Sequence, residues 1–318
     1  MNDLKSLRAD LQRRKLVNGL FAIVGLSVIL VAIIVLISLI LQLVLQGTER
    51  ISPDFFLNFP SRKPEKAGIL SAWVGSSLVM LVTMLAAVPL GVAAGIYLEE
   101  YARKNLISDL IEINVTNLAG VPSIVYGLLA LGLFIYQFSL GQSILTAGLT
   151  LALLILPVVI VTTREALRAI PGHLREAAYA LGASKWQMIW DHILPYSFGS
   201  ILTGIIIGLS RAIGETAPVI TIGALAYIGF LPDSPFVEGF PFIPFQGEFP
   251  FLNFGKLFAW IQAPFTVMPI QMFNWVSRPE PEFQVNAAAA GTVLICMTLA
   301  MNGLAIYLRY YFRKGIKW

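Results

Sequence analysis

Long runs of apolar residues, separated by short charged segments, set the pattern of the sequence. Residues 16–48, 67–98 and 113–163 contain no charged residue. At about 1.5 Å per residue, the third run would form one helix of about 76 Å, more than twice the hydrocarbon thickness of a bilayer, which is about 30 Å. We therefore expect two membrane spans there, folded as a hairpin with its turn at residues 137–143.

Two further apolar runs bring the number of expected membrane-spanning helices to six. They are residues 196–227 and 283–308. The chain of 318 residues is 57% hydrophobic and only 13% charged, whereas about a quarter of the residues in a soluble domain are charged. The sequence therefore predicts an all-α membrane protein. Two Gly-x-x-x-Gly patterns, at residues 91–95 and 204–208, allow close packing between helices.

The first apolar run begins after a basic segment, as the apolar region of a signal peptide does. Residues 1–15 carry five Lys and Arg side chains. The apolar region of a signal peptide is about 7–15 residues long, and this run is roughly twice that length, with no convincing cleavage site. We expect the run to remain in the protein as a membrane anchor.

Lys and Arg are distributed unevenly between the two sides of the predicted bundle. The N-terminal segment, the link at 99–112, the polar segment that starts at Arg164 and the C-terminal tail carry 15 of the 22. The loops on the opposite side carry six, and Arg211 lies within a span. Because cytoplasmic segments are enriched in Lys and Arg, we expect both termini and the polar segment to be cytoplasmic.

The polar segment Thr163–Pro195 is too strongly patterned to be a simple connector. After a break at Pro171 and Gly172, a short helix is predicted over residues 173–181, with one apolar face at i, i+3, i+4 and i+7. Gly182 ends this helix, because the residue after a helix often takes the left-handed conformation. The residues of the apolar face are Leu174, Ala177, Ala178 and Leu181.

A second short helix is expected after the glycine. Ser184 and Gln187 have the spacing of a capping box, in which a hydroxyl at the N-cap and a glutamine at N3 each bond the other's backbone. Pro195 is expected to end the helix. Its large apolar residues are Trp186, Ile189, Trp190 and Ile193.

The two short helices form a compact knob, residues 171–195, for which two interpretations are open. In one, the knob docks into a socket on another protein. In the other, both helices lie on the lipid surface, with Trp186 and Trp190 at the headgroups. The small side chains of Ala177 and Ala178 favour the first interpretation, because they bury little area in lipid but allow another backbone to approach.

The loop at 228–282 is rich in proline and phenylalanine. It holds nine of the 18 prolines and eleven phenylalanines, and that many prolines exclude a long helix. The loop is interpreted either as a lid or docking surface on the outer side, or as an aromatic belt resting at the membrane interface.

Arg211 is the charge that most needs an explanation. It lies 16 residues after Pro195, about 24 Å along a helix, and an arginine at that depth needs a partner or a watery path. Glu215, at i+4, is on the same helix face. One interpretation is a structural ion pair. The other is an anion site, where the planar guanidinium binds a tetrahedral oxyanion, Glu215 offsets its charge and Thr216 offers a hydroxyl.

Several classes of site are excluded by composition. Cys296 is the only cysteine, so an intrachain disulfide is impossible, and the only histidines are His173 and His192, which leaves almost nothing to build a zinc or haem site. The chain has no P-loop, nucleophile elbow or His-Glu-x-x-His motif. We therefore expect no bound cofactor, no metal, no catalytic residue and no nucleic acid partner.

The knob resembles the EAA loop of bacterial ABC importer permeases. The matching residues are Glu176, Ala177, Ala178 and Gly182, followed by Leu194-Pro195, and His192 departs from the leading isoleucine of that motif. Four further stretches resemble the phosphate-specific importer, and the Ala-Pro and Phe-Asn-Trp within them favour its A-type permease over the sister C-type. These stretches are 97–101 (YLEEY), 117–127 (NLAGVPSIVYG), 211–218 (RAIGETAP) and 268–275 (MPIQMFNW).

The resemblance covers residues 70–312 and implies a type I ABC importer permease fold and a multi-subunit complex in the bacterial plasma membrane. The implied partners are the C-type permease, two ATPase subunits that bind ATP and Mg, and a periplasmic phosphate-binding protein. Arg211 would line the phosphate path with Glu215 as its counter-charge and Thr216 beside them. The residues implied to dock the ATPase are Arg175, Glu176, Ala177, Ala178 and Gly182.

Three parts of the chain follow from this interpretation. Residues 1–66 are a cytoplasmic segment, the first span and a periplasmic loop. Residues 67–312 are the importer transmembrane domain, with coupling helices at 164–195 and a periplasmic loop at 228–282, and residues 313–318 are a cytoplasmic tail.

Other functions remain open from the residues alone. A permease of the same fold for another oxyanion, such as phosphonate or sulfate, would share these features. An ATP-independent channel or secondary transporter would leave the knob as an interfacial element. A membrane-bound enzyme is disfavoured, because the predicted spans contain no cluster of acid, base or metal-binding residues.

Overall fold

The computed structural model describes residues 2–103, 105–233 and 258–313, and the regular elements within them are helical. The long helices are α1 (Asn2–Gly47), α3 (Leu70–Ile96), α6 (Ile144–Arg168), α9 (Leu194–Ile213) and α12 (Pro281–Arg313). The shorter ones are α2 (Pro53–Leu57), α4 (Leu106–Leu118), α5 (Ser123–Ala130), α7 (Gly172–Ala180), α8 (Lys185–Gln187), α10 (Ala217–Thr221) and α11 (Met268–Val276). The π-helical turns are η3 (Tyr97–Tyr101), η4 (Leu131–Gln137) and η5 (Met188–Ile193).

Among the described residues, five helical segments are long and apolar enough to cross a membrane, and a bent pair makes a sixth candidate. The bent pair joins α4 to α5 and η4 at an angle of 106°. The expected hairpin is confirmed, since η4 ends at Gln137 and α6 begins at Ile144. The first arm of the hairpin is not one continuous helix, because the chain turns sharply at Gly120-Val121-Pro122, where the residue before a proline is disfavoured in a helix.

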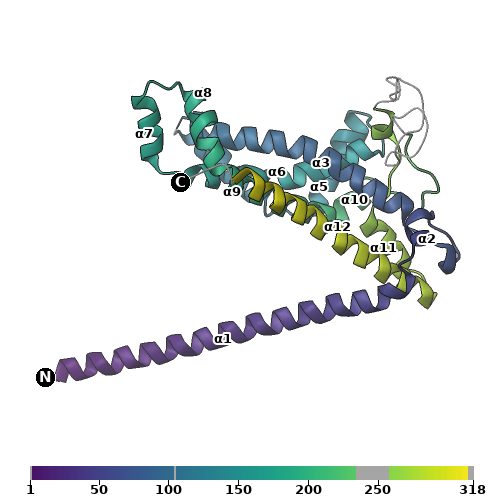
Figure 1. Ribbon diagram of the computed structural model, residues 1–318, viewed down its shortest axis with the longest axis horizontal. Coiled ribbons are helices and arrows are strands. Elements are labelled where there is room, and N and C mark those ends of the chain that lie inside the picture. Colours follow the sequence, from purple (N-terminus) through teal and green to yellow (C-terminus); the bar gives the residue numbers. More distant parts are fainter. Residues whose placement is uncertain (1, 104, 234–257, 314–318) are drawn as a thin grey trace.

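The ends of the helices divide into two groups in Figure 1. The N-terminal end of α1, the knob (α7 and α8) and the C-terminal end of α12 lie at one end of the molecule, while α2 and α11 lie at the other. This arrangement is the one that the positions of Lys and Arg require. Which end is cytoplasmic stays a prediction.

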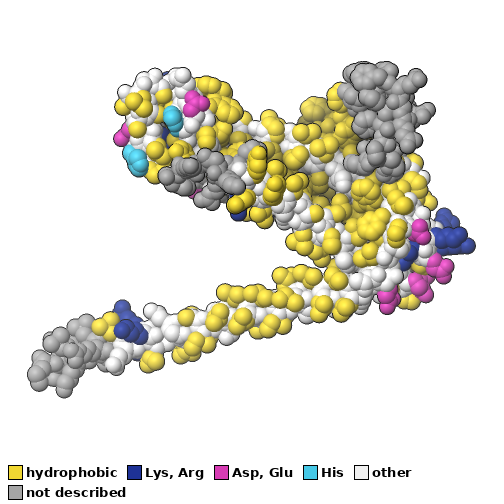
Figure 2. Space-filling view, viewed as in Figure 1, with side chains coloured by type: hydrophobic (Ala, Val, Ile, Leu, Met, Phe, Trp, Pro, Cys, Tyr) yellow, Lys and Arg dark blue, Asp and Glu magenta, His cyan; other side chains and the backbone are white. Residues whose placement is uncertain are grey.

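α1 extends away from the rest of the bundle and touches it only near its own C-terminus (Figure 1). A Cβ on Gly47 would come 2.7–2.8 Å from the backbone of Ala288 and Ala289 in α12, so the two helices cross closely there. The side chains of residues 11–42 are exposed, and Figure 2 shows them to be largely hydrophobic. α1 therefore offers its apolar surface to lipid or to another subunit.

The sequence predicts close helix packing at both Gly-x-x-x-Gly patterns, and in the structure both pack against α6. A Cβ on Gly91 or Gly95 would come 2.7 Å from side chains of α6, and one on Gly204 would overlap the Thr162 side chain. Small residues thus bring both α3 and α9 close to α6, where Val159 lies near Gly91 of α3 and Gly208 of α9.

The helix predicted to end at Pro195 instead continues through it. Lys185–Ile213 forms one helical segment of 29 residues, in which η5 precedes α9. A proline within a helix removes one hydrogen bond and crowds the carbonyl four residues before it. The π-helical turn directly before Pro195 accommodates that defect, because its hydrogen bonds reach one residue further.

Part of the 228–282 loop is buried in the bundle rather than spread at the interface. α11 packs against α12 and α3, with Met268, Gln271 and Trp275 buried. The aromatic-belt interpretation is therefore wrong for these residues. Residues 234–257 lie outside the described part, so a lid or docking surface there stays a prediction.

Candidate functional site

The Arg211–Glu215 ion pair is present at the end of α9. Arg211 Nε lies 3.3 Å from Glu215 Oε1, and α9 ends two residues after Arg211, at Ile213, with Gly214 as its C-cap. The Arg211 side chain is 39% exposed and that of Glu215 is 19% exposed. The guanidinium is thus paired but not sealed between the helices of this chain.

A small hollow lies next to the ion pair, between α3, α6 and α9. Glu215 contributes to its wall, together with Ser76 from α3. Ser76 Oγ also accepts a hydrogen bond from the Met268 N–H at the start of α11, at 2.8 Å. The lining residues are Ser76, Val79, Met80, Leu151, Ala212, Ile213, Glu215, Val219 and Val267. Among these, Glu215 is the one ionisable group in an otherwise mostly apolar wall.

The bend between α4 and α5 packs beside the same region. The Tyr126 hydroxyl donates to the Leu118 carbonyl at 2.7 Å and so closes the bend. A Cβ on Gly127 would lie 2.7 Å from Pro218 Cα in α10. The stretches 117–127 and 211–218 are therefore neighbours in space. The sequence does not predict this contact. Thr216 lies between Glu215 and α10 and is partly buried.

The knob has the elbow that the sequence predicts. Gly182 has φ +81, the Gly182 N–H donates to the Tyr179 carbonyl at 2.9 Å, and the Ala183 N–H donates to the Ala178 carbonyl at 3.0 Å. These two bonds are those of a Schellman motif. The capping box of Ser184 and Gln187 is also present.

The apolar face predicted for the first knob helix is only partly buried. Ala178 is buried and Leu174 half-buried, whereas Ala177 and Leu181 are exposed. Leu181 is the C-cap, with a non-helical ψ of 3, so the helical spacing no longer applies to its side chain. The knob shares a core with the end of α6, formed by Leu167, Ile170, Ala178, Met188, Ile189 and Ile193.

The outer surface of the knob is partly aromatic. Trp186 and Trp190 are 61% and 48% exposed, and their ring centroids lie 5.3 Å apart. Glu176, Ala177 and Gly182 are also exposed. Figure 2 shows hydrophobic, acidic and histidine side chains together on this end of the molecule. Of the residues predicted to dock a partner, Arg175 and Ala178 instead face other parts of this chain.

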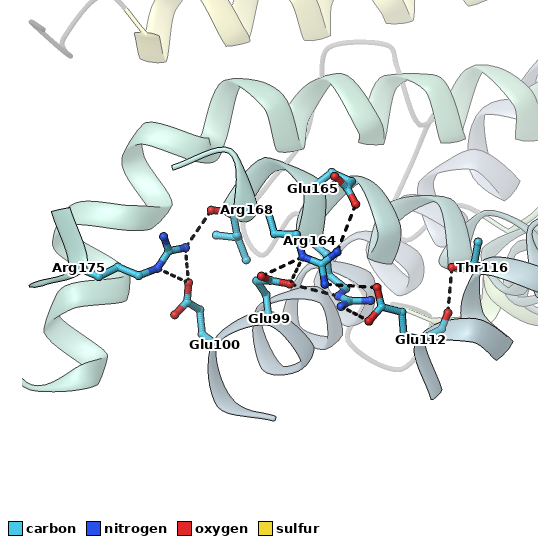
Figure 3. A network of polar contacts seen from close by, with 9 residues as sticks. Glu99, Glu100, Glu112, Thr116, Arg164, Glu165, Arg168 and Arg175 are labelled. Atoms are coloured by element: carbon cyan, nitrogen blue, oxygen red, sulfur yellow. Dashed lines mark hydrogen bonds and ion pairs between the residues drawn. The ribbon is translucent and has the colours of Figure 1, made fainter. Parts of the chain in front are cut away.

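A network of ion pairs joins the knob to the ends of α3, α4 and α6 (Figure 3). Arg164 and Arg168 of α6 both bind Glu99 and Glu112: Nη2 of Arg164 lies 2.7 Å from Glu112, and Nε of Arg168 lies 2.9 Å from Glu99. The second contacts are Arg164 to Glu99 at 3.5 Å and Arg168 to Glu112 at 3.3 Å. α6 therefore continues past Arg164, which is buried, and the polar segment leaves the bundle only after Arg168.

Comparison with known proteins places the chain in a family. Residues 67–236 match the family of binding-protein-dependent transport system inner membrane components. The chain belongs to this family. The probable ABC transporter permease protein YqgI of Bacillus subtilis (strain 168) is 32% identical over 229 residues, which cover 71% of this chain and 76% of the relative.

The resemblance to A-type permeases is confirmed. The phosphate transport system permease protein PstA of Yersinia pestis is 31% identical over 316 residues, which cover 98% of this chain and 95% of the relative. Among solved structures, a chain of the MetNI methionine ABC transporter, in an inward-facing conformation, aligns with a TM-score of 0.52 at 14% identity and covers 75% of this chain and 94% of that chain. The fold is therefore that of a type I ABC importer permease.

The family match spans the elements from α3 to α10, so it contains the ion pair, the knob and every residue that lines the hollow except Val267. Sequence analysis did not predict two features of the site: the place of Ser76 in the hollow and the ion pairs of Glu99 and Glu100. Ser76 lines the hollow, but it is one serine within an apolar run and gives no signal. Glu99 and Glu100 carried a signal, since two adjacent carboxylates end an uncharged run, but their arginine partners lie more than 60 residues away.

Proposed function

We propose that this chain is the membrane-spanning permease subunit of an ATP-driven importer of inorganic phosphate in the bacterial plasma membrane. The chain itself binds no ATP. Hydrolysis belongs to two partner ATPase subunits, which hold ATP and Mg, and a sister C-type permease and a periplasmic phosphate-binding protein complete the complex. The chain contacts lipid and other subunits, not nucleic acid.

The observation that carries the proposal is the partly exposed Arg211, paired with Glu215 beside a hollow in the bundle. The guanidinium keeps its charge and presents planar donors that match the oxygens of phosphate. Glu215 offsets that charge when the path is empty, so the anion is released rather than trapped. Relatives over nearly the full length are named phosphate transport permeases.

The knob supplies the second part of the proposal. Its exposed surface, with Glu176 and Ala177 on α7, Gly182 at the elbow and the tryptophan pair after it, is suited to a groove on an ATPase. Arg175 and Ala178 support that surface from within, because their side chains bind η3 and the knob core. Alternating access then follows as movement of helix bundles against one another.

Uptake by the reconstituted complex tests the substrate. We expect ATP-dependent entry of labelled phosphate into proteoliposomes that contain both permeases, both ATPases and the binding protein. Excess unlabelled phosphate should compete, while sulfate and phosphonate should not. Competition by sulfate or phosphonate instead of phosphate would reassign the chain to another oxyanion.

Co-purification tests the dependence on ATP. An ATPase subunit should purify with the chain in mild detergent, and uptake should stop without ATP. Phosphate entry that continues without ATP and without an ATPase would identify a channel or secondary transporter.

A further inference from the structure

The π-helical turn η3, which continues α3, contacts both arms of the knob, that is, the helices α7 and α8 on the two sides of Gly182. On one arm, Arg175 of α7 donates to Glu100, with Nη2 and Nε lying 2.8 and 3.1 Å from Oε1. On the other arm, the Lys185 ammonium lies 4.9 Å from the centroid of the Tyr101 ring. Arg175 precedes the glycine elbow at Gly182 and Lys185 follows it, so η3 contacts the knob on both sides of that elbow.

Arg175 uses its remaining donors within this chain. Nη1 donates to the Ile170 carbonyl at 2.8 Å, and Nη2 donates to the Leu167 carbonyl at 2.9 Å. The last carbonyls of a helix lack the partners of a continuing helix. Arg175 binds two carbonyls where the chain leaves α6: that of Ile170, and that of Leu167, which also accepts from the Ile170 N–H at 3.2 Å. The side chain of Glu100 is only 7% exposed and that of Arg175 is 22% exposed. Removing either partner would leave the other charge poorly solvated.

α3 connects this contact with the candidate substrate path. The helix runs from the hollow, where Ser76, Val79 and Met80 form part of the wall, to η3 without an interruption. Glu99 of the same turn also binds Arg168 at 2.9 Å. Bonded side chains therefore link α3 to the knob through Glu100 and to α6 through Glu99 (Figure 3).

We propose that Glu100 and Arg175 are positioning residues that transmit movement between the knob and α3, and so couple ATP hydrolysis to opening of the path. This inference rests on the proposed function. It differs from docking, because the Glu100 and Arg175 side chains bind each other within this chain, 2.8 Å apart: the pair acts inside the permease, one step after docking.

The test is the ratio of phosphate transported to ATP hydrolysed in proteoliposomes. In Glu100→Gln and Arg175→Gln we expect this ratio to fall about tenfold, a size typical of coupling between sites, while all subunits still co-purify. Stimulation of the ATPase by the loaded binding protein should fall with it. The matched control is Glu165→Gln, since Glu165 is 67% exposed and makes only a 3.8 Å contact with Arg168; its ratio should be that of the unaltered complex.

Charge reversal shows whether the ion pair between Glu100 and Arg175 matters, or whether each residue is needed for another reason. The double variant Glu100→Arg with Arg175→Glu should recover part of the ratio that Glu100→Arg alone loses. Arg175→Lys keeps the charge but not the two carbonyl bonds, and it should give an intermediate ratio even if the glutamine variants fail to assemble.

Two results would overturn the proposed link. One is an assembled Glu100→Gln complex with an unchanged ratio, and the other is a double reversal no better than the single one. The unaltered complex distinguishes this failure from failure of the proposed function. If it takes up no phosphate, the substrate assignment fails, whereas normal uptake with an unaffected Glu100→Gln variant rejects the link alone.

Discussion

Arg211 and Glu215 form one ion pair, with Nε and Oε1 3.3 Å apart, but they face different surroundings. Glu215 lines the hollow between α3, α6 and α9, while 39% of the Arg211 side chain is exposed. A purely structural pair would gain nothing from that exposure. The arrangement leaves donors of the guanidinium available while its charge is partly neutralised, which is what transient binding of an anion requires.

Substitution of the pair tests the path directly. Arg211→Ala and Glu215→Ala are each expected to abolish phosphate uptake, because one removes the donors and the other leaves an uncompensated charge that retains the anion. Arg211→Lys keeps the charge but loses the planar fork, so uptake should be reduced rather than abolished. Labelled uptake and co-purification of the complex are the measurements.

Arg62→Ala is the matched control for the path variants. Arg62 is exposed in the loop before α3, and Arg62→Ala makes the same chemical change outside the Arg211–Glu215 pair. Its uptake should equal that of the unaltered complex. Normal uptake by assembled Arg211→Ala would remove Arg211 from the path.

Gly182 provides a second prediction, in which the effect of its left-handed backbone conformation can be separated from the effect of side-chain size. A Cβ there would meet nothing within 4 Å in this chain, but φ is +81. Gly182→Asn should be well tolerated, because asparagine adopts the left-handed region more easily than other side chains. Gly182→Leu adds about 1–2 kcal/mol of backbone strain and places bulk on the exposed elbow. We expect it to uncouple hydrolysis from uptake.

The comparison of the two Gly182 variants decides the role of the elbow. ATP hydrolysis and uptake are measured together on purified complexes. Equal and normal rates for Gly182→Leu would contradict docking at this surface. Equal losses for the asparagine and leucine variants would show that the backbone alone matters.

Much of the fold follows from the sequence because the membrane imposes a simple rule. Apolar runs of sufficient length must become helices, so the spans were predictable, as was the turn before Ile144. Gly182 and the Ser184 capping box were predictable because they depend on residues close in sequence.

The remaining features depend on contacts that no local pattern contains. The apolar pattern cannot reveal the 106° bend, because a bent segment and a straight one are equally apolar. Gly120 and Pro122 are the residues in the sequence that indicate it. The helix through Pro195 survives because a π-helical turn precedes it, which the proline rule does not anticipate. The Arg175–Glu100 pair joins residues 75 apart in sequence, so only the packing of α3 beside the knob reveals it.

Packing of α3 on α6 gives a third prediction, with a compensating change. Gly91→Ala would place a Cβ 2.7 Å from the Val159 side chain, and overpacking of this kind costs about 1–3 kcal/mol. We expect a lower thermal midpoint for the purified complex. Val159→Ala in the same chain should restore part of the loss, because it opens space at the contact. Gly132→Ala is the control, since a Cβ at Gly132 meets nothing within 4 Å.

Ser76 gives the last prediction, because it serves both the hollow and the position of α11. Its Oγ accepts from the Met268 N–H at 2.8 Å in a fully buried contact. Ser76→Ala leaves that N–H without its partner, at a cost of about 1–3 kcal/mol, so the thermal midpoint should fall and phosphate uptake should decrease with it. Ser77→Ala is the neighbouring control: Ser77 donates only to the Trp73 carbonyl of its own helix, at 2.9 Å, and its loss should change neither quantity appreciably. A Ser76→Ala complex as stable and as active as the Ser77→Ala complex would mean that α11 is held by its apolar contacts alone.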